Sequence, residues 1–448
     1  MFFSKEKTEK ELTKNQSLKK DFIKQAVPSI ASMWVSALYT MIDGMFVSKG
    51  VGPEALAAVN LTVPFVNAIF GLSVLFSIGT STITSYALGK GDKNKASEHF
   101  SLSLTFLTVL SIMLTTLSFI NLNSLCGFLG ADSKNILMVK NYLGIIVLFA
   151  PFYMISYALE VLIKVDGYPQ LSIVGVIISA ITNIVLDYLF VIKFGWGVEG
   201  AALATGLARV FSFIFFASHF LGKKSNLKLK KFKFNLDIIK RVVSIGFSDC
   251  ITELSMGVVI LLFNQCIIAT LGDTGLITYS VVSYINTLVI STMLGISQAL
   301  QPLTSFYNGS GDMESVKRLL NISLKTTALF SIIILSMCIF FGDVLVLMFI
   351  EKTNVDIFKY AVNVLKIFSI SFAILGFNVV TSGALASIEK PKDAGVISMG
   401  RGLVVIFITV ILSICMFGGN GIWISTILSE FTVLIFSVIK IKEIFRLA

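Results

Sequence analysis

The tetrapeptide Gly89-Lys90-Gly91-Asp92 recurs as Gly309-Ser310-Gly311-Asp312, 220 positions further along the chain. Two more loop motifs return at almost the same offset: Gly197-x-x-Gly200-Ala201-Ala202 as Gly418-x-x-Gly421-Ile422-Trp423 after 221 positions, and Gly167-Tyr168-Pro169 as Glu389-Lys390-Pro391 after 222. These offsets are close to half of the 448 residues, so the chain is predicted to contain two homologous lobes. Membrane proteins with parallel halves are mostly secondary transporters, in which the substrate path runs between the lobes.

The composition is typical of an integral membrane protein. Hydrophobic residues make up 55% of it and charged residues 14%, and the mean hydropathy is +0.87, far from the values of a soluble domain. A bilayer core about 30 Å thick needs about 20 apolar residues for each helix that crosses it. Twelve stretches are long enough: 26–48, 56–88, 100–120, 138–163, 170–193, 198–221, 242–270, 276–307, 320–342, 356–386, 393–416 and 421–440. We therefore predict an all-α integral membrane protein with twelve transmembrane helices in two six-helix lobes.

Basic residues predict the orientation of the spans. An even number of spans puts both termini and the central linker on one side, which collects 26 Lys and Arg residues against six on the other. The positive-inside rule makes the larger set cytoplasmic, so we expect a multi-pass protein of a bacterial plasma membrane with both termini in the cytoplasm. The predicted organisation is a cytoplasmic segment 1–25, an N-lobe 26–221, a basic linker 222–241, a C-lobe 242–440 and a cytoplasmic tail 441–448.

The basic loops, the cysteines and the two histidines are not predicted to form a binding or catalytic site. The net charge of +10 follows from this topology rather than from a nucleic-acid partner, and no such partner is predicted. The linker, with six lysines in residues 223–233, is expected to be a solvated connection. Five cysteines without CxxC spacing indicate neither a disulfide framework nor a thiolate metal site. His99 and His219 end different spans near the cytoplasmic surface, where we expect solvated or headgroup positions.

Polar residues inside the first lobe's spans indicate the chemistry, because a charge at the bilayer centre costs about 2.5–3.5 kcal/mol. Asp43 lies near the outer end of the first span, and Asn183 and Asp187 share one face of the fifth at i, i+4. Thr205 lies about two turns inside the sixth. Two carboxylates, an amide oxygen and a hydroxyl at one depth can coordinate Na⁺ or share a proton. The alternative is that each of them only caps or bonds a neighbouring helix.

The second lobe does not repeat this set. The positions that correspond to Asp43 and Asp187 fall near Phe263 and Thr409, which carry no charge. Its own candidates for a substrate or cation site are Glu253, Gln265 and Asn378. Arg209 and Glu430 occupy equivalent places in the two lobes, and a structural ion pair is favoured over a gate contact. Pro28 precedes Asp43 by fifteen residues and either permits bending of the first span or sets a static kink.

In this order, these residues resemble the multidrug and toxic compound extrusion (MATE) transporters over essentially the full chain, and the pattern is closest to the bacterial branch related to the MepA and DinF types. The resemblance is carried by Pro28 with Asp43, Gly89-Lys90-Gly91-Asp92, Asn183-x-x-x-Asp187, Gly200-Ala201-Ala202-x-Ala204-Thr205, and Gln301-Pro302 with Asn308-Gly309. The family implies antiport, in which entry of Na⁺ or H⁺ drives export of cationic amphipathic compounds through a V-shaped pair of lobes.

The resemblance also implies roles for particular residues. Asp43, Asn183, Asp187 and Thr205 match an N-lobe cation site, which would hold Na⁺ if the protein is sodium-coupled, and Pro28 matches the point where the first helix bends. Another branch of the family couples through a span-seven Glu with a span-ten Asp. Glu253 matches the former, but span ten offers Asn378 and no Asp, which favours coupling in the N-lobe.

The expected function is therefore cation-coupled export of drugs and dyes by a monomer that holds no cofactor besides the coupling Na⁺ or H⁺. The rival within the superfamily is a flippase for lipid-linked precursors, which requires a cationic central cavity; intramembrane Lys and Arg are nearly absent from the outer halves of the spans. An enzyme is not expected. The chain has only two histidines, each at the end of a predicted span, and no DDxxD pattern, so it lacks the residues of a membrane-surface catalytic site.

Overall fold

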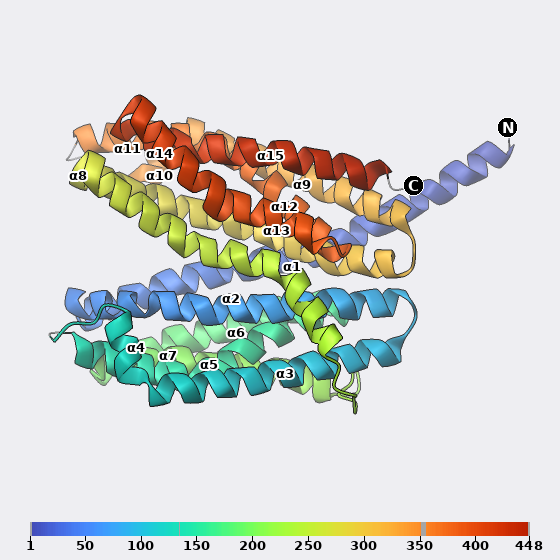
Figure 1. Ribbon diagram of the computed structural model, residues 1–448, viewed down its shortest axis with the longest axis horizontal. Helices are drawn as coiled ribbons and strands as arrows, with labels where there is room; N and C mark the ends of the chain where they lie inside the picture. Colours follow the sequence, from blue (N-terminus) through green and yellow to red (C-terminus); the bar gives the residue numbers. More distant parts are fainter. Residues whose placement is uncertain (1, 134, 351–354, 447–448) are drawn as a thin grey trace. The chain divides into compact units, whose positions relative to one another are not determined.

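A computed structural model describes residues 2–133, 135–350 and 355–446, with the side chains of residues 2–13 and 53 left aside. Helices make up nearly all of this part of the chain, and none of it forms a strand (Figure 1). The α-helices are α1 (Phe2–Gly50), α2 (Pro53–Gly89), α3 (Lys93–Ile120), α4 (Leu122–Phe128), α5 (Ile136–Val165), α6 (Pro169–Asp187), α7 (Gly197–Leu221), α8 (Leu236–Gly309), α9 (Met313–Phe340), α10 (Gly342–Leu347), α11 (Val355–Phe368), α12 (Phe372–Ser387), α13 (Pro391–Met399), α14 (Val405–Phe417) and α15 (Ile422–Arg446).

Twelve membrane crossings follow from these helices. Within the described residues, eleven helical stretches are long and apolar enough to span a bilayer. One of them, α8, has 74 residues, which at 1.5 Å per residue is about 110 Å and several times the bilayer core. Its backbone leaves helical geometry at Gly272, with φ 62° and ψ −153°, so α8 is two spans joined at a kink. The prediction of an all-α protein with twelve spans is confirmed.

The repeated Gly-x-Gly-Asp motif has the same local structure in both copies. Gly91 and Gly311 both have φ +77°, a conformation that favours glycine. The following aspartates are helix N-caps: Asp92 accepts from the Lys95 N–H at 2.9 Å and Asp312 from the Ser315 N–H at 3.0 Å. The Lys95 N–H lowers the pKa of Asp92 below its ordinary value. Burial opposes ionisation of Asp312, but hydrogen bonds from Lys14 and Ser315 outweigh it and lower the pKa of this carboxyl too.

The helices form two compact units, each described by itself. The N-unit is Ala31–Glu253, and the C-unit is the segment up to Ile30 together with the chain from Leu254 onward. In the N-unit, α5 packs against α2, α3, α6 and α7, which run roughly parallel in Figure 1. In the C-unit, α12 packs against α9, α13 and α15. The predicted lobe boundaries at 221 and 242 remain a prediction, because the division of contacts falls inside α1 and α8.

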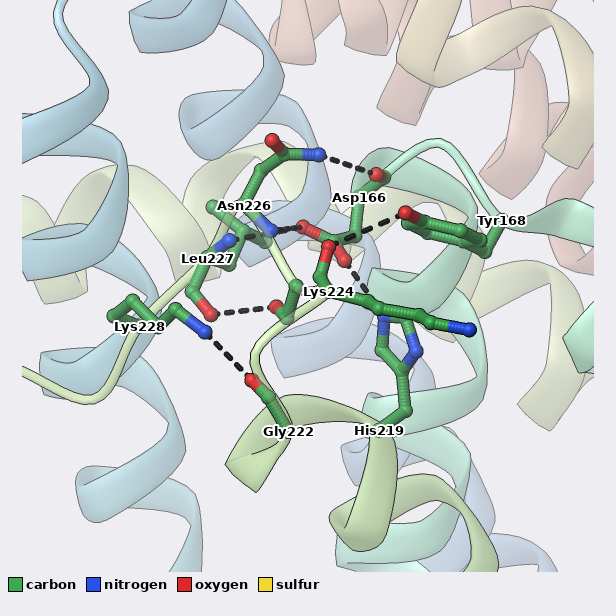
Figure 2. Close-up of polar contacts among 9 residues, drawn as sticks. Asp166, Tyr168, His219, Gly222, Lys224, Asn226, Leu227 and Lys228 are labelled. Carbon is green, nitrogen blue, oxygen red and sulfur yellow. Dashed lines mark hydrogen bonds and ion pairs between the residues drawn. The ribbon is translucent and has the colours of Figure 1, made fainter.

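The linker that follows α7 is held against the N-unit, which corrects the expectation of a solvated connection. Asp166, in the turn between α5 and α6, accepts hydrogen bonds from the backbone N–H groups of Asn226 at 2.8 Å and Leu227 at 2.9 Å (Figure 2). Asn226 Nδ2 donates back to the Asp166 carbonyl at 3.1 Å. His219 Nε2 lies 2.7 Å from Asp166 Oδ2, and its side chain is buried. The solvated position expected for His219 is therefore wrong, because the α5–α6 turn supplies a buried carboxylate beside it.

Further bonds extend this attachment along the linker. The backbone N–H groups of Lys228 and Lys230 donate to the hydroxyls of Ser97 and Ser101, one turn apart on α3, at 3.3 and 2.9 Å. The Lys228 ammonium donates to the Gly222 carbonyl at 2.6 Å (Figure 2). Leu227 is fully buried. The linker backbone thus satisfies its polar groups on the N-unit, while its charged side chains from Lys230 to Lys233 stay exposed.

Candidate cation-coupling and substrate site

Four polar residues predicted at a common depth come from three different helices of the N-unit. Asn183 and Asp187 lie one turn apart on α6, and both side chains are 0% exposed. Thr205 is on α7 and the half-buried Asp43 is on α1. Directly after Asp187 the helix widens into a π-helical turn, Tyr188–Lys193, a distortion that is frequent at functional sites.

An apolar cluster next to these residues holds their helices together. It includes Val47 of α1, Tyr142 of α5 and Ala201 of α7, all buried. The cluster places low-dielectric material beside the polar residues, which strengthens the electrostatic interactions among them.

Hydrogen bonds join the four residues into one site. Asn183 Nδ2 donates to Thr205 Oγ1 at 3.3 Å, and Thr205 Oγ1 donates to Asp43 Oδ1 at 3.5 Å. The carboxyls of Asp43 and Asp187 are neighbours that interact directly with one another and with Asn183. The structure thus brings Asp43, Asn183, Asp187 and Thr205 together.

Several oxygens in this site have no hydrogen-bond donor among the residues that the structure describes. Within the described residues, both carboxylate oxygens of Asp187 and the amide oxygen of Asn183 are buried and have no hydrogen-bond partner at normal geometry, while the Asn183 side chain lies close enough to interact with the Asp187 carboxyl. A hydrogen bond between the adjacent carboxyls of Asp43 and Asp187 needs a proton to be present. Buried acceptors without donors are costly, so the site has the chemistry to take a proton or a hard cation such as Na⁺. In the described part of the chain, no group of three or more His, Cys, Asp or Glu forms a metal site of the usual kind.

A small cavity of about 70 Å³ adjoins this site inside the N-unit. Its wall is apolar apart from Thr205, Arg209 and two tyrosines, and the lining residues are Val66, Ile69, Tyr142, Ile146, Phe149, Ala150, Tyr153, Thr205, Gly206 and Arg209. Thr205 belongs both to the polar site and to the wall of the cavity. Its hydroxyl can therefore contact a compound in the cavity as well as a cation at the carboxylates. The tyrosines were not predicted as site residues, since nothing in the sequence marks which aromatic residues face inward.

Arg209 and Glu430 find their partners inside their own units. Arg209 Nη2 donates to the Tyr39 hydroxyl, and its guanidinium carbon lies 4.4 Å from the centre of the Tyr153 ring. Glu430 accepts from Arg401 Nη2 at 2.9 Å. The ion pair between Arg209 and Glu430 stays a prediction, since the two residues belong to different units.

The C-lobe candidates are in different settings. Asn378 is fully buried, donates to Glu430 Oε2 at 2.7 Å and accepts from Ser437 Oγ at 2.7 Å. Gln265 is exposed on α8. Glu253 lies one turn after Asp249 on α8. Their roles in substrate or cation binding stay predictions. So does the bend at Pro28, through which α1 runs as an unbroken helix.

Comparison with known proteins agrees with the fold. The MatE family model matches residues 28–189 and 250–412, once in each half of the chain. The chain belongs to the MatE family and is a multi-pass membrane transporter.

Particular relatives are similar along nearly the whole chain. It is 24% identical over 409 residues to the multidrug export protein MepA of Staphylococcus aureus (strain MSSA476), covering 90% of this chain and 89% of that one. It is 25% identical over 407 residues to MepA of Staphylococcus saprophyticus, with the same coverage. Among solved structures, an outward-facing multidrug resistance MATE family transporter of the MOP superfamily superposes with a TM-score of 0.90 at 23% identity, covering 96% of this chain and 97% of that one. A MOP superfamily transporter from Pyrococcus furiosus gives 0.88 at 22% identity, with the same two coverages.

Proposed function

We propose that this protein is a cation-coupled multidrug antiporter, which exports cationic amphipathic compounds across a bacterial plasma membrane in exchange for Na⁺ or H⁺. One observation carries the proposal: the buried oxygens of Asn183 and Asp187 adjoin the Asp43 carboxyl and, in the described part of the chain, have no hydrogen-bond donor at normal geometry. The relatives named as multidrug export proteins support the substrate class. Termini in the cytoplasm, as the basic residues predict, and a monomeric state complete the proposal.

The proposed mechanism is competition between the cation and the drug for the N-unit. With Asp43 and Asp187 ionised and empty, the two charges favour a bound organic cation. Entry of a proton or Na⁺ neutralises the cluster. Keeping a charge in the membrane interior costs about 2.5–3.5 kcal/mol, so neutralising one carboxylate shifts a two-state equilibrium by roughly 100-fold. In this mechanism α1 then bends near Pro28, the cavity beside Thr205 changes shape, and the drug leaves on the outer side by alternating access.

The rival function, flipping of lipid-linked precursors, has weaker support. A pyrophosphate group needs several cations around it, whereas the cavity of the N-unit is lined by one basic residue, Arg209, among the residues described.

The test is transport by the purified protein in proteoliposomes. Ethidium or norfloxacin is loaded, and efflux is followed by fluorescence under an imposed pH gradient, an imposed Na⁺ gradient or neither. We expect one of the two gradients to drive uphill movement of the compound. Movement that is equally fast without any gradient would contradict coupling, and the identity of the driving gradient decides between H⁺ and Na⁺.

A further inference from the structure

The linker that follows α7 carries a concentrated positive charge at one end of the N-unit. Residues 222–241 contain eight basic residues and one acid, Asp237, whose carboxylate lies 3.6 Å from the Lys240 ammonium of the same segment. The Lys230 ammonium donates to the Asn94 amide oxygen at 2.6 Å, which orients its charge without neutralising it. Three consecutive basic positions of the linker have exposed side chains, here called the linker lysines: Lys230, Lys231 and Lys233.

Hydrogen bonds to α3 fix the height of the linker along that helix. The backbone N–H groups of Lys228 and Lys230 donate to the hydroxyls of Ser97 and Ser101. The membrane crossing predicted for this helix begins at residue 100, and only 17% of the apolar stretch of α3 is buried. The linker is therefore attached where a largely exposed apolar helix enters the bilayer, which is the depth of the lipid headgroups.

Large apolar side chains accompany the linker lysines. Leu227 is fully buried in a core cluster of the N-unit and anchors the segment, whereas Leu229 is 54% and Phe234 66% exposed. Apolar side chains between lysines are typical of a segment at a membrane surface, where the apolar groups enter the boundary between headgroups and acyl chains and the lysines meet anionic headgroups. A nucleic acid or another soluble polyanion would leave these apolar side chains in water.

We propose that the linker is a binding site for anionic phospholipids of the cytoplasmic leaflet. The linker lysines contact the phosphate of a lipid with a net negative headgroup, such as phosphatidylglycerol, and Leu229 and Phe234 contact its acyl chains. Because the bonds to Ser97 and Ser101 already hold the backbone in place, the site loses little conformational freedom when the lipid binds. The leaflet follows from the orientation in the proposed function, whereas lipid binding itself does not depend on transport.

The experiment compares phosphatidylglycerol with phosphatidylcholine of the same acyl chains, so that the two probes differ only in the headgroup. Each is titrated onto the full-length protein in detergent, and native mass spectrometry measures the bound lipid. One variant combines Lys230→Gln, Lys231→Gln and Lys233→Gln. Its matched control loses the same charge from three exposed lysines of the N-unit on the predicted outer side, by the changes Lys49→Gln, Lys140→Gln and Lys193→Gln. Thermal unfolding reports whether each fold is intact.

In the wild type we expect phosphatidylglycerol to bind at least about tenfold more tightly than phosphatidylcholine, since one lysine near a membrane surface contributes about fivefold. The linker variant should lose this preference, the outer control should keep it, and high salt should weaken it. An equal loss in both triple variants would reduce the effect to net charge and overturn the site, as would an unchanged preference in the linker variant. Displacement of the lipid by glycerol 3-phosphate, which has the phosphate and no acyl chains, would also overturn the assignment to a phospholipid.

Discussion

Gly79 of α2 lies in backbone contact with Val242 of α8: a Cβ atom at Gly79 would stand 2.1 Å from the Val242 carbonyl oxygen. The contact is reciprocal, because a Cβ at Gly246 would stand 1.9 Å from the carbonyl oxygen of Leu75. Two glycines therefore let α2 and the start of α8 cross without side chains between them. The C-unit has a similar crossing, in which a Cβ at Gly295 would meet the Cα of Ile30 at 2.7 Å. Glycines thus permit close backbone packing at the start of α8, which follows the linker, and at the part of α1 that precedes the N-unit.

The first prediction concerns this crossing. Gly79→Ala places a methyl group against backbone that cannot rotate away, so the helices must separate and the fold should lose about 1–3 kcal/mol. The control is Gly127→Ala on α4, where nothing lies within 4 Å of an added Cβ and the substitution should be neutral or slightly stabilising. Thermal unfolding in detergent, followed by size-exclusion chromatography, measures both. Equal melting temperatures for the two variants would mean that the crossing tolerates a wider spacing.

The sequence predicted the helical elements and the N-unit polar site, because both follow from local patterns. A long apolar run predicts a helix that crosses the bilayer. A carboxylate such as Asp43 within such a run indicates a functional site, because placing a charge in the membrane interior costs free energy. The attachment of the linker was not predictable, since Asp166 binds backbone N–H groups, which every residue except proline carries. The setting of Arg209 was missed for a related reason: its tyrosine partners come from α1 and α5, and sequence spacing does not reveal which aromatic rings of distant helices face one arginine.

The second prediction tests the linker attachment. Asp166→Ala removes the acceptor of two backbone N–H groups and the partner of His219, and leaving buried donors unpaired costs about 1–3 kcal/mol each. We expect a lower melting temperature and faster tryptic cleavage after Lys228 and Lys230. The control Asp237→Ala changes a carboxylate whose side chain is 88% exposed and should alter neither. If trypsin cuts both variants at the same rate, these bonds do not hold the linker in place.

The third prediction separates the two proposed locations of the cation site. Asp187→Asn and Asn183→Ala remove ligand oxygens from the buried cluster and should impair gradient-driven export at least tenfold. Glu253→Gln, on α8 outside this cluster, should mainly change the range of drugs or the rate. Export of ethidium and norfloxacin under each gradient is compared for the three variants. Loss of Na⁺-dependent transport in Glu253→Gln with normal coupling in Asp187→Asn would instead place the cation site at Glu253.

The last prediction concerns Asp43, the carboxyl that the Thr205 hydroxyl ties to Asn183. Asp43→Asn keeps the size of the side chain and its ability to accept from Thr205, but it cannot gain or lose a proton and binds Na⁺ without a formal charge. The variant should insert into the membrane and unfold at or slightly above the wild-type temperature, because it removes a costly buried charge and no packing. Gradient-driven export should fall to the level of empty liposomes, since residue 43 is then permanently neutral and Asp187 alone no longer provides the charge difference between the loaded and the empty site. Fluorescence efflux in proteoliposomes, normalised to the amount of inserted protein, measures the loss. Full transport by Asp43→Asn would exclude Asp43 from coupling and leave Asp187 as the only carboxyl of the cluster able to carry the charge.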